Sequence, residues 1–144
     1  MKRLFAVVVV ACLLASYIGC ATVSVPTSQA LAIPYNQWIA PEFAIKHASG
    51  DVEVIVKRDS GVFGSGYTIV FHVEGKPIVK LEAGEIARLY LPPGKHLLGV
   101  FPEPNILWAG TLYEIEADVR TDLAQVYRIF ITSSGAIQIS RTSQ

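Results

Sequence analysis

The residue types of a hydrolytic triad occur close together in this chain, as Asp59, Ser60 and His72. A serine becomes a nucleophile only when a base lies within hydrogen-bond reach and a third group orients that base. A common local signature of such a serine is a G-x-S-x-G turn between a strand and a helix, and Ser60 lacks it. We therefore expect no catalytic residue and a protein that is not an enzyme; a hydrolase is the last-ranked hypothesis.

Side chains that bind metals are present, but they are not spaced as ligands. The three histidines lack the short spacing of zinc sites and lie far apart in the sequence, at His47, His72 and His96. Three carboxylates alternate along one predicted strand at intervals of about 6.6–6.8 Å, at Glu114, Glu116 and Asp118. A calcium loop instead gathers carboxylates together with backbone carbonyls. We expect a solvated strand face, no metal and no cofactor.

A glycine-rich loop, Ser60 to Gly66, superficially resembles the loops that cradle phosphates. Those loops lead from a strand into the N-terminus of a helix and carry a lysine that reaches the phosphates. Here the loop leads into a predicted strand at Tyr67, and no Gly-Lys-Ser/Thr follows. We interpret it as a hairpin connection. Phe63 at its tip is a candidate contact residue, because aromatic side chains on loops often mark binding surfaces; the equal alternative is that it folds back as a plug over the end of the sandwich.

Two further aromatic residues, Trp108 and Tyr113, flank the turn at Ala109-Gly110. With Trp38, they offer flat rings on which a sugar could stack, so glycan binding is one hypothesis. The preferred interpretation is packing in the core or at the rim of a sheet. The candidate residues for contact with a ligand or partner are therefore Phe63, Trp108 and Tyr113.

The N-terminus has the order of regions found in a secretory signal. Met1 to Arg3 is cationic, and Leu4 to Leu14 is an unbroken apolar run that is shorter than the roughly 20 residues a membrane-spanning helix needs. Gly19 and Cys20 end this region, with Ile18 before them. This ending resembles a bacterial lipobox, although Tyr17 stands where leucine is usual. Cleavage by ordinary signal peptidase after Ala21 is the alternative.

The cysteine count supports the lipobox. Cys12 would leave with the leader, so Cys20 would have no intramolecular partner in an oxidising compartment. The resemblance implies that Cys20 becomes the mature N-terminus and carries a diacylglycerol and an N-acyl chain, which together anchor firmly. It also implies, from Ala21 at the next position, attachment to the bacterial outer membrane, at its periplasmic face.

Beyond Gly50 the apolar residues alternate with a period of two, which predicts strands. Four such runs are clear, at 52–57, 67–74, 112–119 and 126–131. Turns separate the strands; one is Glu74 to Pro77, and another is Pro92 to Gly94, across which we expect the His96 ring to hydrogen-bond. No helical period reaches 12 residues in the mature domain. The expected fold is all-β, an antiparallel β-sandwich of about eight short strands.

The chain divides into three regions. Residues 1–19 are the predicted lipoprotein signal peptide; residues 20–50 contain the lipidated N-terminus, a tether from Ala21 to Pro34 and a partly packed segment; and residues 51–144 form the sandwich. A free tether of this length would hold the domain on the order of 20 Å from the membrane. Beyond it, we expect Trp38, Ile39 or Phe43 to pack on the domain.

The stretch from Val54 to His96, "VIVKRDSGVFGSGYTIVFHVEGKPIVKLEAGEIARLYLPPGKH", has a recognisable order of features. It resembles a family of small bacterial lipoproteins that share a β-sandwich domain without an assigned function, and more distantly the PEGA and transthyretin-like sandwiches. The matching features are Arg58, Gly64-Ser65, Gly75-Lys76, Leu81 with Gly84, and Pro92-Pro93-Gly94-Lys95-His96. Glu74 replaces the usual aspartate of the hairpin.

Charge limits the range of partners. The whole chain has 12 basic and 12 acidic residues, and loss of Lys2 and Arg3 with the leader leaves 10 against 12, a formal charge of −2. Without a basic patch we expect no nucleic-acid partner. The sequence therefore favours a protein held at the membrane by its N-terminal lipid that binds or scaffolds an envelope protein; peptidoglycan binding is the alternative.

Overall fold

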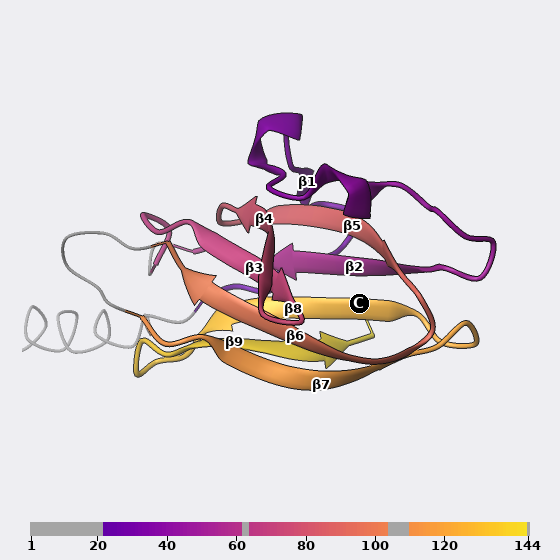
Figure 1. The fold of residues 1–144 in the computed structure, drawn as a ribbon. Helices are drawn as coiled ribbons and strands as arrows, with labels where there is room; N and C mark the ends of the chain where they lie inside the picture. Colours follow the sequence, from indigo (N-terminus) through magenta and orange to yellow (C-terminus); the bar gives the residue numbers. More distant parts are fainter. Residues whose placement is uncertain (1–21, 62–63, 104–109, 144) are drawn as a thin grey trace, which may run out of the picture.

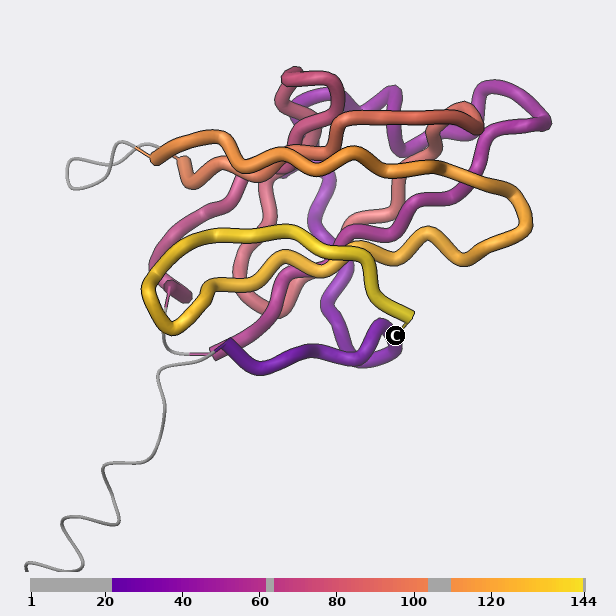
Figure 2. The backbone as a smooth tube through the Cα atoms, turned by 90° about the horizontal axis from the view of Figure 1, so that it is seen from below, coloured from indigo at the N-terminus to yellow at the C-terminus, as the bar shows by residue number. Residues whose placement is uncertain are grey.

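The computed structural model describes residues 22–61, 64–103 and 110–143, which form two β-sheets in separate layers (Figures 1 and 2). One sheet has five strands in the order β1-β5-β2-β8-β9, and the other has four in the order β4-β3-β6-β7. The β1–β5 and β2–β8 pairs are parallel, and the other five pairs are antiparallel. The prediction of an all-β, antiparallel sandwich of about eight short strands is confirmed, with these two parallel pairs as departures from it.

The nine strands are short, and eight of them, β2 to β9, lie beyond Gly50, where the described residues contain no helix. Their bounds are β1 Leu31–Ala32, β2 Val52–Arg58, β3 Ile69–Val73, β4 Lys76–Leu81, β5 Glu85–Leu91, β6 Gly94–Pro102, β7 Tyr113–Val119, β8 Gln125–Ile131 and β9 Ile137–Thr142. Two 3-10 helices precede β2, η2 Tyr35–Gln37 and η3 Pro41–Ala44. The predicted strand 67–74 is shorter than expected, because it begins at Ile69.

The core lies between the sheets and is built mainly from alternate residues of β2 to β9, as the alternation predicted, although the neighbours Ile78 and Val79 of β4 are both buried in it. Val54 and Val56 of β2 are fully buried, and so are Ile69 and Phe71 of β3. Further members are Val73, Leu81, Leu89, Leu98, Val100, Ala117, Val119, Tyr127, Ile129 and Ile139. The inward faces of both sheets therefore form one continuous apolar cluster.

The predicted turns are present with the expected backbone. Glu74 and Gly75 have φ values of 51° and 71°, which is the type I′ geometry of a two-residue hairpin between β3 and β4. The ring of His96 bonds to the Pro92 carbonyl oxygen through Nε2, at 2.9 Å, so the expected bond across the Pro92–Gly94 turn is confirmed. His96 Nδ1 also lies 3.2 Å from Glu74 Oε1, which ties the two turns together.

The even-numbered strands β2, β4, β6 and β8 all end at the same end of the sandwich, where Thr22 lies (Figure 1). We call it the Thr22 end. It carries four connections, of which the described residues are 59–61 and 64–68, 82–84, 103 with 110–112, and 132–136. The turns at 74–75, 92–93 and 120–124 lie at the opposite end.

Residues 22–33, expected to be part of a free tether, are instead bonded along the domain, and we call them the strap. Val23 pairs with Ser60 through two backbone hydrogen bonds of 2.7 and 3.0 Å. Farther on, β1 adds to the edge of β5 as a parallel strand. The tether expectation is wrong for these residues, because they are held by backbone pairing, which needs no side-chain period.

The segment from 35 to 50 packs partly on the domain, as expected. Trp38 and Phe43 pack against the core, whereas Ile39 is exposed although its amide bonds to the Ile78 carbonyl at 2.9 Å. Trp38 also forms an isolated bridge with Val79 of β4. Within the described part of the chain, no helix has both the length and the apolar character to cross a bilayer.

Candidate functional site

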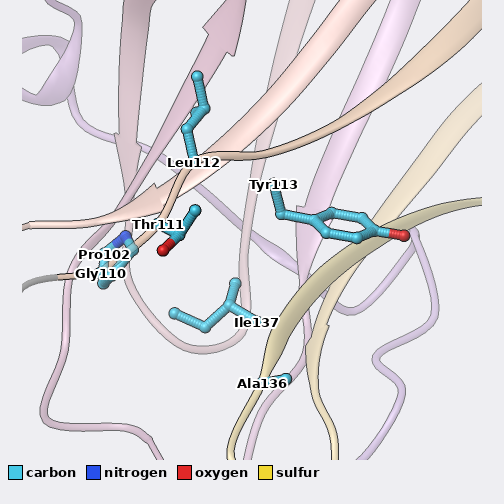
Figure 3. Close-up of a pocket in the computed structure, with 7 residues that line it drawn as sticks. All are labelled: Pro102, Gly110, Thr111, Leu112, Tyr113, Ala136 and Ile137. Atoms are coloured by element: carbon cyan, nitrogen blue, oxygen red, sulfur yellow. The ribbon is translucent and has the colours of Figure 1, made fainter.

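Of the four residues singled out by the sequence, one lies in the described part of the chain. Cys20, Phe63 and Trp108 are outside the described residues. Tyr113 opens β7 with 39% of its surface exposed, and it lines a hollow of about 340 Å³ at the Thr22 end. The other lining residues are Pro102, Gly110, Thr111, Leu112, Ala136 and Ile137 (Figure 3). The hydroxyl end of Tyr113 points away from them (Figure 3).

Trp38 and Tyr113 do not form one aromatic platform. Trp38 pairs with Val79 of β4, and Tyr113 belongs to β7. These strands are the two edges of the four-stranded sheet, so three strand spacings, about 14 Å, separate them. A stacked sugar at Tyr113 would therefore not contact Trp38.

The structure does not assemble Asp59, Ser60 and His72 into a triad. The Asp59 carboxylate is held by Arg128, and Ser60 Oγ lies 3.4 Å from the Val23 carbonyl oxygen. His72 is on β3, in the other sheet, where its Nδ1 lies 3.1 Å from the Val70 carbonyl oxygen. Burial lowers the pKa of His72, which favours the neutral ring. Each residue thus has a separate structural contact.

Arg58 is a buried side chain at the Thr22 end that contacts the backbone of three other residues. Its guanidinium donates to three backbone carbonyls, to Tyr67 at 2.5 Å, to Leu81 at 2.7 Å and to Gly64 at 2.6 Å. Burial lowers the pKa of Arg58, and Glu82 and Glu85 act in the opposite direction. The arginine that carried the family resemblance therefore fixes the path of the glycine-rich loop, a role that the sequence alone did not reveal.

Asp59, which follows β2, and Arg128 of the neighbouring strand β8 form a bidentate ion pair. Arg128 Nε lies 2.8 Å from Asp59 Oδ1, and its Nη2 lies 2.5 Å from Oδ2. The Thr22 hydroxyl donates to the same carboxylate at 3.1 Å, so the first described residue of the strap joins the pair. The Arg128 guanidinium also lies over the ring of Phe130, 5.1 Å from its centroid.

Lys57 is buried beneath the strap. Its Nζ donates to the carbonyl oxygen of Val25, at 2.7 Å. Burial lowers the pKa of Lys57, while the nearby Asp59 raises it. Lys57 and Asp59 are two residues apart in the sequence and so share the outer face of β2. The sequence predicted that Lys57 would alternate away from the core, which it does, but the strap covers it.

The candidate metal ligands remain separate. His47 Nε2 bonds to the Glu42 carbonyl at 2.9 Å, and no group of three or more His, Cys, Asp or Glu side chains converges within the described ranges. The carboxylates of β7 are exposed, as expected of a solvated strand face. One of them, Glu116, pairs with Lys95 on the neighbouring strand at 3.0 Å.

A feature that the sequence reading missed is the exposed apolar side chains between residues 31 and 45. In the part of the chain that the structure describes, eight large apolar side chains are exposed, and four of them lie in this stretch, at 45–79% exposure: Leu31, Tyr35, Ile39 and Ile45. We call them the exposed apolar set. The segment lies along the β4 and β5 side of the sandwich (Figure 1). The apolar content of this segment could have indicated an exposed surface, but it was interpreted only as packing on the domain.

Comparison with known proteins gave no match to this chain among protein-family models, curated proteins or solved structures. The resemblance to small envelope lipoproteins therefore stays an expectation based on Arg58, the hairpin and the proline turn.

Proposed function

We propose that this protein is a lipid-anchored lipoprotein of the bacterial envelope whose sandwich binds a partner protein and carries out no chemistry of its own. The observation that carries the proposal is the exposed apolar set. Large apolar side chains gathered in one exposed segment mark interaction surfaces more often than isolated ones do. The residues between them, such as Trp38 and Phe43, pack on the core, which holds the segment on the domain.

The partner experiment uses photocrosslinking in intact cells. Benzoylphenylalanine at Tyr35 or Ile45 should give one defined protein adduct, because both positions belong to the exposed apolar set. The matched control is Leu97, which is exposed to 43% but lies on β6, in the four-stranded sheet. Equal adducts from all three positions, or adducts from none, would contradict a docking surface at residues 31–45.

A second pair of variants separates binding from folding. Tyr35→Ser and Ile45→Ser remove apolar surface that is already in water, so each should change the free energy of unfolding by no more than about 0.5 kcal/mol. We expect Tyr35→Ser to remove the adduct formed from position 45, and Ile45→Ser to remove the adduct formed from position 35, while the urea midpoint of each serine variant stays the same.

The anchor has its own test. Metabolic labelling with a clickable palmitate should mark the wild-type protein, and Cys20→Ser should remove the label. Label on the Cys20→Ser protein would refute Cys20 as the site of acylation.

Peptidoglycan binding is the second candidate, and the half-exposed ring of Tyr113 beside the hollow favours it. Peptidoglycan fragments should then change the intrinsic fluorescence of the protein, and Tyr113→Ala should weaken the change. A flat titration would exclude a ring stacked on sugar.

A further inference from the structure

We infer that the Thr22 end of the sandwich rests on the phospholipid headgroups, so that the bilayer is itself a partner of this face. The inference rests on the proposed acylation of Cys20. It adds an orientation: the described residues of the connections at the Thr22 end face lipid, and the turns at 74–75, 92–93 and 120–124 face away from it.

The first step is that the chain is fixed to the domain from its first described residue. The Thr22 hydroxyl bonds to Asp59, Val23 pairs twice with the backbone of Ser60, and Lys57 bonds to the Val25 carbonyl. The Ile131 amide also donates to the Thr22 hydroxyl, at 3.3 Å. Several bonds at successive residues must open together before the strap can leave the sheet. Thr22 is therefore a fixed point on the domain.

The second step is the length of chain between this point and the lipid. Ala21 alone separates Cys20 from Thr22, so the two Cα atoms are at most about 7 Å apart. The headgroup layer on each side of a bilayer is about 5–7 Å thick. A lipid on Cys20 therefore places Thr22 within or directly above the headgroups, and the rest of that end lies beside it.

The third step is that the chemistry of the end is compatible with lipid. Among the described residues of its connections, those at 60–61, 64–66 and 132–136 are small and uncharged. The ionised side chains in its described connections are Asp59, Glu82 and Glu103. Asp59 is paired with Arg128 and Glu103 with Lys80, while Glu82 accepts a hydrogen bond of 2.6 Å from Thr68. The partly apolar hollow beside Tyr113 also opens here.

The test compares two exposed turn residues on either side of β8. Ser133 lies at the Thr22 end and Thr121 at the opposite end, and the seven-residue strand between these turns spans about 23 Å. Each is changed to cysteine in the full chain, which is matured in cells, purified and labelled with an environment-sensitive dye. Cys20 will not react with the dye when its sulfur is in a thioether. The proteins are reconstituted in phosphatidylcholine vesicles that contain a headgroup-nitroxide lipid.

We expect the dye at Ser133→Cys to shift its emission to the blue and to lose intensity to the nitroxide, and the dye at Thr121→Cys to do neither. Insertion of ten Gly and Ser residues between Ala21 and Thr22 should abolish the loss at position 133, because such a spacer adds about 17 Å of mean reach. Equal quenching at both positions, or quenching that survives the spacer, would overturn the inference.

Intact mass of the same samples distinguishes the two proposals. If the acyl mass is present and the two dyes respond alike, the orientation is wrong and the lipoprotein proposal stands. If the acyl mass is absent, the lipoprotein proposal fails and the orientation fails with it.

Discussion

Replacement of Arg58 by methionine tests whether this single side chain holds the Thr22 end together. Methionine fills a similar space but removes the guanidinium that donates to three carbonyl oxygens, those of Gly64, Tyr67 and Leu81. We expect the fold to survive, because the core between the sheets does not depend on Arg58, and the glycine-rich loop to loosen.

The magnitude follows from the contacts. A hydrogen bond to a charged group contributes about 1.5–3 kcal/mol, so three give a gross loss of about 5–9 kcal/mol. Two effects reduce it. First, the variant no longer bears the free-energy cost of desolvating the guanidinium, the same burial that lowers the pKa of Arg58. Second, the carbonyls of Gly64 and Tyr67 belong to a loop that can turn to water. The Leu81 bond is buried and has no such replacement. The net cost should be about 2–4 kcal/mol.

Urea unfolding followed by tryptophan fluorescence measures the cost, because Trp38 packs against the core. The control is Arg88→Met on β5, which removes an exposed pair with Glu53 and should cost no more than about 1 kcal/mol. Hydrogen exchange should also show faster exchange of the Tyr67 amide in Arg58→Met, since that amide bonds to Gly64 within the loop. A loss below about 1 kcal/mol, or equal losses at both arginines, would refute the reasoning.

Three further outcomes are expected. Asp59→Asn should lower the free energy of unfolding in urea by about 2–3 kcal/mol, which is less than for a fully buried pair because Arg128 keeps some contact with water. The same variant should speed hydrogen exchange of the Val23 amide. Unchanged exchange at Val23 would show that the ion pair does not hold the strap. Burial lowers the pKa of His72 below its ordinary value of 6.5, so the folded state binds fewer protons than the unfolded state between the two pKa values. The free energy of unfolding should therefore fall as the pH falls through this window, and it should fall less in His72→Gln. An equal fall in His72→Gln would contradict the assignment to His72. Gly64→Ala, at φ 76° with its Cβ 2.0 Å from Ile131 Cδ1, should cost more than Gly75→Ala, which has a similar φ and no neighbour within 4 Å; equal costs in urea unfolding would show that Ile131 moves freely.

The fold was predictable because its information is local. Alternation along β2, β3, β7 and β8 shows which residues face a core, and the residues at 74–75 and 92–94 specify turns by their backbone preferences. Parallel pairing of β2 with β8 was not predictable in this way. It depends on strands more than 60 residues apart, and the period of a strand is the same in either pairing direction.

The candidate site was harder to predict, for a different reason. Tyr113 was found because an aromatic residue beside a turn is visible in the sequence. The role of Arg58 was not, because its partners are backbone carbonyls, which any residue supplies. The exposed apolar set escaped because composition reports that Tyr35 or Ile45 is apolar and does not report which of the apolar residues near them reach the core.

The strap changes the environment of the charged side chains that it covers. On an uncovered sheet, Lys57 and Asp59 would be ordinary solvated charges on the outer face of β2. Under the strap, Lys57 bonds to the Val25 carbonyl, and Asp59 accepts hydrogen bonds from Arg128 and Thr22. Charged groups buried in this way need those partners, and the strap needs them too, because its side chains at Val23 and Leu31 are exposed and bury little apolar surface. The strap is therefore held mainly by hydrogen bonds, with Ile33 packed against the core, so a variant that removes Asp59 should loosen the strap at Thr22 without opening the core.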